Sequence, residues 1–406
     1  MRLFPALLCL ALPLTLAPAS ATTSPTPRPH QHHWQTSEHV VGPARPTAPP
    51  YARVVTRTRL RFGYQVRPGI HVASYQQRIG ARNIRYYLVT IDWRRRGVGF
   101  TLAQPRDTDM VQRVRWMTEK TPHAVVGVNG DFFDIGRTGA PLGLGVLRGR
   151  VQHGINAGWN RAFYVDRRGD PHIGEEPLTA VSPTHPKLGV TNVNSPWVRP
   201  GGIGVYNFRW GRTAGRAWVQ GDKDVLMAHL VDHRVEGFAT TYPAGQLLTG
   251  QYLVARGAEA VARLKRLSVG DSVRLRISAL HQPRMAVTGN AYLVQGGKIV
   301  ATDDTELHPR TAVGIDRGRH RVYLLVVEGR QEFSDGFTMV ELARKFRALG
   351  CDGALNLDGG GSTTLVAQER GALQLLNSPS DGQQRAVANA LAVTYVQPRR
   401  RHHHHH

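Results

Sequence analysis

NLDGGGSTTL, residues 356–365, places an asparagine and an aspartate beside three glycines and three hydroxyl-bearing residues. The apolar residues Ala354, Leu355 and Leu357 predict a buried strand that leads into it. Three consecutive glycines end such a strand at a cost in backbone entropy, although an ordinary turn needs only one or two. A bare backbone lets several N–H groups converge on an anion. The donors predicted for this nest are the N–H groups of Gly359, Gly360 and Gly361 and the hydroxyl groups of Ser362, Thr363 and Thr364.

Three other stretches carry polar residues next to apolar strands. VVGVNGDFFD (125–134) delivers Asn129 and Asp131 two residues apart, so that they share a face if the strand continues. ELHPRTAVGID (306–316) sets His308 and Arg310 around a proline. SPSDGQQRAVANALAV (378–393) places a further set before the last strand, namely Asp381, Arg385 and Asn389. Each stretch also has a plain interpretation, because Asn-Gly and Asp-Gly form ordinary turns and a single arginine or histidine is commonly a surface group.

Several familiar catalytic patterns are missing from the sequence. It contains no G-x-S-x-G, H-E-x-x-H, Walker A or paired C-x-x-C motif. The glycine run lacks the G-x-G-x-x-G order and follows an aspartate, which disfavours a dinucleotide site. There is also no RNP-type aromatic motif, recognition-helix pattern or zinc-finger pattern, so no nucleic-acid partner is expected.

The first residues indicate export. LFPALLCLALPLTLAP is an apolar segment followed by ASA at 19–21, which is typical of a secretory peptide cut after Ala21 and too short and Pro-broken to span a membrane. We therefore expect a signal peptide over 1–21 and a Pro/His-rich linker over 22–50, whose histidines at 30, 32 and 33 either are solvated or bind metal. A catalytic domain is expected over 51–397 and a basic, His-rich tail over 398–406, the latter either a tag or native.

The charge indicates what kind of partner this chain binds, and the cysteine content indicates whether it has a disulfide. The formal charge is +23, with arginine far more frequent than lysine, so polyanions are attracted to this chain. Outside the cell or in its envelope (the periplasm, if the organism is Gram-negative), an anionic glycopolymer is the expected partner, with a generally basic surface as the alternative. Cys9 leaves with the signal peptide, so Cys351 is expected to be a lone buried thiol without a disulfide.

Strand patterns dominate the rest of the chain and predict an α+β fold, with a few helices packed on a mixed or antiparallel sheet. The strands are expected within 86–93, 97–103, 124–133, 142–151, 161–169, 271–280, 291–300, 311–329, 353–361, 362–368 and 389–396. Helices are expected within 106–122, 257–271 and 334–353. Their candidate N-caps are Asp107 or Thr108 for the first and Ser334 for the third, and Gly350 is the expected stop of the third. The Pro/Gly/Asn-rich stretch 171–215 is expected to be a long excursion.

The polar stretches together resemble a known family. VNGDFFD, HPRTAVGID, NLDGGGSTTL and RAVANALAV occur in the order and approximate spacing of the phosphodiester glycosidases, and the resemblance runs from about residue 65 to 397. It implies a glycosidase that hydrolyses the sugar-side bond of a glycosyl-1-phosphodiester, giving a free sugar and a phosphomonoester. The implied substrate is an anionic phosphoglycan or a small glycosyl phosphate, and no cofactor is required.

The residues suit that reaction. Its leaving group is already an anion, so convergent donors and a fixed cation help more than proton transfer. Arg310 is expected to clamp phosphate in a bidentate fork, with His308, Arg385, Ser362 and Thr363 and the glycine run as further phosphate or substrate contacts. Asp131 and Asp358 are the candidate base and acid or stabiliser, in an order left open, and Asn129 is expected to orient a sugar hydroxyl or the water. The side chains of Asn129, Asp131, Arg310 and Asp358 should converge in one pocket of substrate size.

Two other interpretations use the same residues. Asp131, Asp358 and His308 are a possible ligand set for a divalent metal in a phosphodiesterase that cleaves the P–O bond, although no spacing demands it. Alternatively, the domain is a non-catalytic module that grips phosphate in a wall polymer.

The export signal generates a first prediction. Exported protein should begin near Thr22, because the A-x-A site directly precedes a polar linker. N-terminal sequencing of protein recovered from the culture medium or the cell envelope checks this. Retention of Met1 or of the apolar segment in that protein would contradict it.

Overall fold

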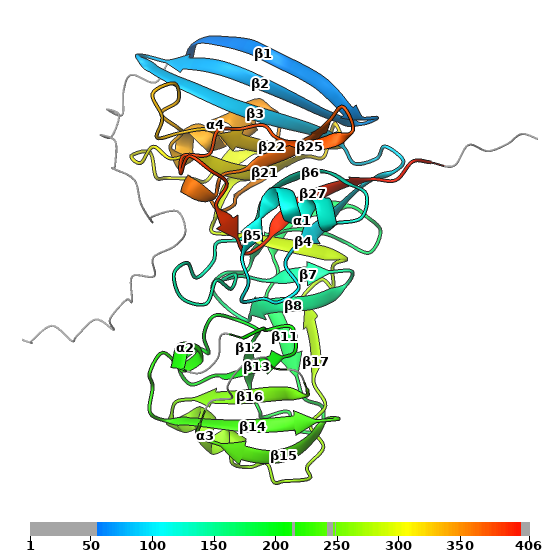
Figure 1. Cartoon of the computed structure of the whole chain (residues 1–406), viewed down its shortest axis with the longest axis vertical. Coiled ribbons are helices and arrows are strands. Elements are labelled where there is room, and N and C mark those ends of the chain that lie inside the picture. The colour runs from blue at the N-terminus through cyan, green and yellow to red at the C-terminus, as the bar shows by residue number, and fades with distance from the viewer. Residues whose placement is uncertain (1–54, 213–215, 242–246, 248, 399–406) are drawn as a thin grey trace, which may run out of the picture. The chain divides into compact units, whose positions relative to one another are not determined.

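The computed structural model describes residues 55–212, 216–241, 247 and 249–398 (Figure 1). These residues fall within one compact unit, Gln35–His406. The predicted signal peptide, its cleavage site, the whole predicted linker and residues 399–406 of the tail lie outside the described residues. Among the described residues, no helix has the length and apolar character needed to cross a bilayer.

Most of the strands are arranged in three larger sheets. The eight-stranded sheet consists of β1 (Val55–Arg67), β2 (Ile70–Ile79), β3 (Arg82–Asp92), β22 (Arg321–Val327), β21 (Arg310–Asp316), β23 (Gly353–Asn356), β19 (Ala291–Gln295) and β20 (Lys298–Ile299), in that spatial order. The five-stranded sheet consists of β25 (Ala372–Leu375), β24 (Leu365–Glu369), β6 (Ala124–Asn129), β27 (Ala390–Tyr395) and β4 (Val98–Ala103).

The ten-stranded sheet consists of β10 (Pro171–Glu175), β9 (Arg161–Val165), β18 (Met285–Gly289), β7 (Gly145–Leu147), β8 (Arg150–Ile155), β12 (Val190–Val193), β13 (Ile203–Asn207), β16 (Gln251–Arg256), β14 (Val225–Val231) and β15 (Arg234–Ala239). Two small pairs join β11 (Leu178–Val181) to β17 (Arg276–Ala279), and β26 (Ala386–Val387) to β5 (Gln112–Arg113). Neighbouring strands of the eight-stranded sheet are all antiparallel, whereas β12 and β13 pair in parallel.

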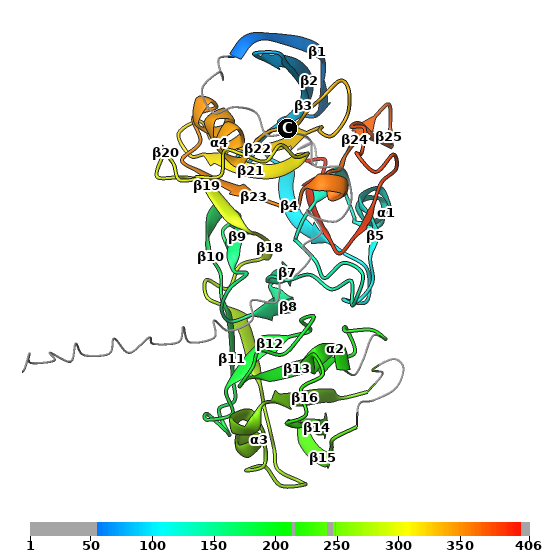
Figure 2. The same ribbon diagram turned by 90° about the vertical axis from the view of Figure 1, so that its left-hand side faces the viewer.

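The helices in the described part are short. They are α1 (Val114–Lys120), α2 (Arg216–Val219), α3 (Ala258–Leu264), α4 (Met339–Ala348) and the 3₁₀ helix η1 (Gly360–Ser362). α4 lies against the eight-stranded sheet, next to β19 and β20 (Figure 2). The expectation of a strand-rich protein with few helices is confirmed.

The inner strands of the eight-stranded sheet are buried on both faces. On one face, Val89 and Leu324 pack with Val126 and Leu391 of the five-stranded sheet. On the other face, Tyr86 and its neighbours pack against the apolar side of α4. Because both faces are covered, β21 and β22 are almost continuously apolar rather than alternating.

Several local predictions are confirmed. The helices expected within 257–271 and 334–353 correspond to α3 and α4, and Cys351 is a buried free thiol where α4 leads into β23. Gly350 has φ +86° directly after the last turn of α4, as a C-terminal glycine stop requires.

The predicted caps are wrong. α1 begins at Val114, because Thr108 and Asp109 donate their backbone N–H groups to the carbonyls of residues 209 and 210 instead of starting a helix. Asp107 consequently caps nothing there. α4 begins after Thr338 rather than near Ser334, whose hydroxyl instead donates to the Glu328 carbonyl.

The stretch 171–215 is also not a loop. It contains β10, β11, β12 and β13, and its Pro, Gly and Asn residues fall mainly in the turns between these four short strands.

The sequence analysis missed the two strands β1 and β2, which precede the first strand that it identified. Residues 57–63 of β1 are exposed, so this edge strand carries no buried face for a periodic pattern to reveal.

The cap of α4 yields a stability prediction. The Thr338 hydroxyl accepts from the Glu341 N–H at 3.1 Å, and the Glu341 carboxylate accepts from the Thr338 N–H at 3.1 Å, which forms a capping box. Thr338→Ala should lower the free energy of unfolding by about 1 kcal/mol, measured by urea denaturation. Thr338→Ser keeps the hydroxyl and is the matched control. Equal stability of the alanine variant and the parent would contradict the prediction.

Candidate functional site

The side-chain amide of Asn129, at the end of β6, connects two sheets. Its Nδ2 donates to the Asp358 carbonyl at 2.5 Å. Its Oδ1 accepts from the Thr311 hydroxyl of β21 at 2.7 Å and from the Thr364 N–H at 3.1 Å. All four residues are buried, and both ends of the amide bond to protein groups. In this structure Asn129 therefore positions the strand ends, in place of the predicted contact with a sugar or water.

Asp131 lies two residues further on and is only 1% exposed. Its Oδ1 accepts from the hydroxyl of Thr288 at 2.6 Å and from the N–H of the same residue. Its Oδ2 accepts from Asn389 Nδ2 at 2.8 Å, while Asn389 Oδ1 accepts from the Asp131 N–H at 2.9 Å. Burial raises the pKa of Asp131 to about 7, and the three donors oppose that rise.

Three sheets meet at this hydrogen-bond network. Asn129 belongs to the five-stranded sheet and Asn389 directly precedes its strand β27, Thr311 belongs to the eight-stranded sheet, and Thr288 lies in β18 of the ten-stranded sheet. Gly130, between the two polar residues, donates to the Asn389 carbonyl and accepts from the Asp358 N–H, both at 3.0 Å. The network thus joins strand ends that are far apart in the sequence.

Asp358 leads from this network into the glycine turn. It is fully buried, and its Oδ1 accepts from the Gly359 N–H at 2.9 Å. Gly360 has φ +57° and donates its N–H to the Pro309 carbonyl at 2.9 Å. The Ser362 N–H donates to the Gly359 carbonyl, which closes the 3₁₀ turn.

These bonds correct the predicted nest. The N–H groups of Gly359 and Gly360 were expected to converge on an anion, but both donate to acceptors of the protein itself. The Ser362 N–H is likewise engaged within the turn. The reason is that the Asp358 carboxylate and the Pro309 carbonyl already accept from these N–H groups, and the sequence pattern does not reveal these acceptors. The Thr363 hydroxyl, in contrast, is buried and bonds to none of the described residues.

Two arginines come from segments that contact the glycine turn. Arg310 is 2% exposed and directs Nε to the Phe337 carbonyl at 3.0 Å and Nη2 to the Glu306 carbonyl at 3.1 Å. Two backbone carbonyls therefore hold the positively charged Arg310 guanidinium in place. Its neighbour Pro309 is bonded to Gly360, so the Arg310 stretch and the glycine turn lie side by side.

His308 is held between two charged residues. Arg330 Nη2 lies 2.6 Å from His308 Nδ1, and His308 Nε2 lies 2.9 Å from Glu306 Oε2. Since a guanidinium only donates, Nδ1 is the acceptor and the ring proton lies on Nε2, which donates to Glu306. The His308 side chain is 14% exposed, so it is more accessible than Arg310.

Arg385 lies directly over the glycine turn. It forms an ion pair with Asp381 at 2.8 Å and donates to the Ser362 hydroxyl at 3.4 Å. A Cβ atom on Gly361 would come within 2.1 Å of Arg385 Nη2 and 2.2 Å of Asp381 Oδ1. Glycine is required at 361 because this ion pair occupies the place of a side chain.

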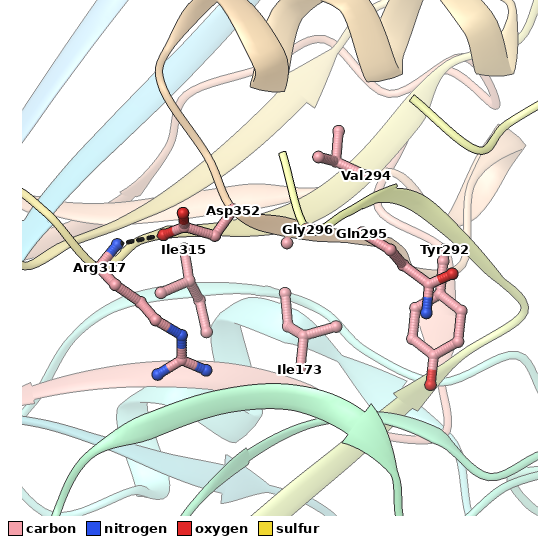
Figure 3. A pocket seen from close by; sticks show the side chains of 9 residues that line it. Ile173, Tyr292, Val294, Gln295, Gly296, Ile315, Arg317 and Asp352 are labelled. Atoms are coloured by element: carbon pink, nitrogen blue, oxygen red, sulfur yellow. Dashed lines mark hydrogen bonds between the residues drawn. The ribbon is translucent and has the colours of Figure 1, made fainter. Parts of the chain in front are cut away.

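The four side chains predicted to line a pocket instead converge in the buried interior. Asn129, Asp131, Arg310 and Asp358 are each at most 2% exposed. Figure 3 shows a pocket elsewhere, with a volume of about 260 Å³, where Ile173, Tyr292 and Arg317 surround an opening beside β23. The predicted pocket of substrate size is therefore not formed by those four residues in this structure.

Sequence reasoning missed three partners of the network. Thr288, Thr311 and Arg330 each bond to a predicted site residue. Thr311 lies within the stretch 306–316 but was not singled out, and Thr288 and Arg330 lie outside the four motifs. Asn389 was noted beside Arg385 but was not placed among the site residues. Thr288 precedes Gly289-Asn290 at a strand end, the same arrangement that drew attention to Asn129, and this was the available signal.

The described residues offer no metal centre. They contain no group of three or more His, Cys, Asp or Glu side chains arranged to hold a metal ion. Asp131 and Asp358 take their bonds from protein donors, and His308 directs its ring to Glu306 and Arg330. The ligand set considered for a metal-dependent phosphodiesterase is thus not assembled.

Comparison with known proteins supports a family assignment. Residues 227–394 match the family described as phosphodiester glycosidase, a range that includes the glycine turn, Arg310 and Arg385. Asn129 and Asp131 lie outside the matched range and join it through hydrogen bonds to Asp358 and Asn389.

Two solved structures and one curated relative are similar to the chain. A protein from Synechocystis aligns with a TM-score of 0.67 and 21% identity, over 81% of this chain and 62% of its own. A protein from Burkholderia pseudomallei aligns with a TM-score of 0.60 and 20% identity, over 77% and 74% of the two chains. At such identities the alignments show the fold alone.

The SPbeta prophage-derived uncharacterized protein YomE of Bacillus subtilis is 35% identical over 88 residues, which are 22% of this chain and 13% of YomE. This chain therefore corresponds to only a small part of that relative.

The burial of Asp131 yields a pH-dependent prediction. Its pKa is about 7 in the folded protein against 3.8 ordinarily, so the folded state binds the proton more tightly between these values. The contribution of Asp131 to the free energy of unfolding therefore falls as the pH rises from about 4 to about 7. Thr288→Val removes a donor to the carboxylate and should destabilise by about 1.5–3 kcal/mol at pH 8, and by less at pH 5.

Thr311→Val is the matched control, because the Thr311 hydroxyl donates to a neutral amide and its loss should have the same effect at both pH values. Urea denaturation of the parent and both variants at pH 5 and pH 8 measures the difference. A Thr288→Val effect that is identical at the two pH values would show that Asp131 does not ionise in this range.

Proposed function

Because residues 227–394 match the phosphodiester glycosidase family, we propose that this protein is a hydrolase that cleaves the sugar-side bond of a glycosyl-1-phosphodiester. The products are a free sugar and a phosphomonoester. The observation that carries the proposal is the placement of a buried aspartate, Asp358, directly before a glycine turn that Arg385 contacts and that is bonded to the Pro309 backbone, next to Arg310.

The charges around the turn fit an anionic leaving group. Arg385 donates to the Ser362 hydroxyl of the turn, and Arg310 follows Pro309, whose carbonyl accepts from the Gly360 N–H. Hydrogen bonds fix both guanidinium groups in advance. Fixed cations stabilise charge that develops on the leaving phosphate without reorganising during the reaction. Arg385 is the proposed phosphate contact, because its side chain is partly exposed while Arg310 is nearly enclosed.

We assign different roles to the two aspartates. Both oxygens of Asp131 are held by Thr288 and Asn389, so Asp131 is proposed as a positioning residue for the strand ends. Asp358 adjoins the turn and is proposed as the carboxylate that stabilises positive charge at the sugar carbon or activates the attacking water. Asn129 supports it by donating to the Asp358 carbonyl.

The substrate proposed is a glycosyl phosphate in an extracellular or cell-envelope phosphoglycan. The formal charge of +23 supports this proposal, since a strongly basic protein accumulates on polyanions. The export signal expected over residues 1–21 would bring the enzyme to such a polymer.

A labelling experiment tests the reaction. The protein is incubated with a panel of sugar-1-phosphodiesters in water enriched in ¹⁸O, and the products are identified by mass spectrometry. Cleavage of the sugar-side C–O bond leaves the phosphomonoester without ¹⁸O, whereas cleavage of a P–O bond puts one ¹⁸O into it. Label in the phosphate would establish the phosphodiesterase alternative, and absence of any turnover across the panel would favour a binding module.

Asp358→Asn provides the matching mutational prediction. The amide oxygen still accepts from the Gly359 N–H and the volume is nearly unchanged, so the fold should persist. Turnover should fall by about 10²- to 10⁴-fold, because an amide neither acts as a base nor stabilises positive charge. Urea denaturation checks the fold and product formation checks the activity. A correctly folded variant that works at the parent rate would remove Asp358 from the mechanism.

A further inference from the structure

A second pocket lies between the edge of the eight-stranded sheet and α4, and it has a volume of about 260 Å³. Ile79 of β2 and Phe337 provide apolar walls. The polar residues that line it are Thr58, Gln77, Glu341, Arg344 and Lys345. The pocket therefore combines an apolar surface with two cationic side chains from neighbouring positions of one helix.

Lys345 is unusual among the lysines of this chain. The sequence contains six, and Lys345 is partly buried while the other five are exposed. Its Nζ donates to Gln77 Oε1 at 2.9 Å and lies 4.3 Å from the centre of the Tyr86 ring. Among the residues that the structure describes, it forms no ion pair with a carboxylate. Burial lowers the pKa of Lys345 to about 8, so most of the amines are still protonated at pH 7.

The one carboxylate in the pocket is already engaged. Glu341 forms an ion pair with Arg82 and accepts from the Thr338 N–H in the cap of α4. It is therefore not the counterion of Lys345. Arg344 and Lys345 leave the pocket with a net positive charge, and a partly buried ammonium without a carboxylate is stabilised by binding an anion.

We propose that this pocket is a binding site for a small organic phosphate. The dianionic phosphate lies between Lys345 Nζ and the Arg344 guanidinium, and both cations form charge-assisted hydrogen bonds with its oxygens. The apolar part of the ligand packs against Ile79 and Phe337. A phosphate fits better than a carboxylate, because two cations face the ligand and a monoester carries two negative charges near neutral pH.

Phe337 connects this pocket to the glycine turn. Its ring lines the pocket, while its carbonyl accepts from Arg310 Nε at 3.0 Å and its N–H bonds to the His308 carbonyl at 3.1 Å. A ligand that packs on the ring thus touches the residue that positions Arg310. The binding proposal does not depend on the proposed hydrolase activity, and its test requires no turnover.

Protection from acylation tests the site. The full chain is treated at pH 8 with a limiting amount of an amine-acetylating reagent, with and without phenyl phosphate, and each lysine is quantified by peptide mass spectrometry. Phenyl phosphate at about 10 mM should slow acetylation of Lys345 by roughly fivefold or more, as expected for an ammonium held in charge-assisted hydrogen bonds. The five exposed lysines are internal controls and should be unaffected.

The choice of probe and variants identifies the chemistry. Inorganic phosphate should protect less than phenyl phosphate, because it lacks the part that packs on Phe337, and benzyl alcohol should not protect. Calorimetric titration of phenyl phosphate should show at least a tenfold loss of affinity in Lys345→Met and Arg344→Gln, with little change in Arg347→Gln, whose side chain lies on α4 outside the pocket lining.

Asp358→Asn should bind phenyl phosphate at this pocket as the parent does, which separates the pocket from the glycine turn. Equal acetylation of Lys345 with and without phenyl phosphate would overturn the proposal, as would full affinity in Lys345→Met. Stronger protection by benzoate than by phenyl phosphate would overturn the assignment to phosphates.

Discussion

The structure depends on the hydrogen bonds that two buried asparagine side chains make where three sheets meet. Asn129 joins the five-stranded to the eight-stranded sheet, and Asn389 holds Asp131, which in turn accepts from Thr288 of the ten-stranded sheet. A polar group in such a place is costly unless every donor and acceptor is satisfied. The two amides and the Asp131 carboxylate meet this condition through geometry that only one arrangement of the strand ends allows. The network therefore specifies the register at which the sheets join.

The same network explains why a carboxylate is retained at a position where burial raises its pKa to about 7. An apolar residue at 131 would avoid the desolvation, but it would leave the Thr288 N–H and Asn389 Nδ2 as buried donors without acceptors. Burial disfavours the ionised form of Asp131 and three donors favour it, so the ionised and protonated carboxyl are close in free energy near pH 7. Positions that are tuned in this way commonly belong to functional sites, which is consistent with the proximity of Asp358 and the glycine turn.

The sequence predicted the elements whose signals are local. The third helix was found because Leu342, Phe346 and Leu349 recur at helical spacing before Gly350. The motifs around residues 129, 310, 358 and 389 were found because polar residues border apolar strands. The sequence did not predict features that depend on contacts between distant segments. Ser334 has the chemistry of a cap, but its hydroxyl bonds to Glu328, so Thr338 takes that role. β1 carries exposed arginines on an edge, which leaves no periodic trace of a strand.

The glycine turn shows why the candidate site itself was only partly predictable. A run of three glycines indicates that there is no room for side chains, but it does not reveal which groups occupy that space. Gly360 has a positive φ, and Gly361 is crowded by Arg385 and Asp381.

The Gly359 N–H, in turn, donates to Asp358. The bare backbone thus makes room for side chains of the protein, rather than forming the open nest that was expected. If phosphate binds here, its charge is met chiefly by arginine side chains fixed beside the turn. Such a site distinguishes anionic substrates by the positions of its cations, and these positions are set by carbonyls of segments 306–309 and 337 that the sequence motif alone does not reveal.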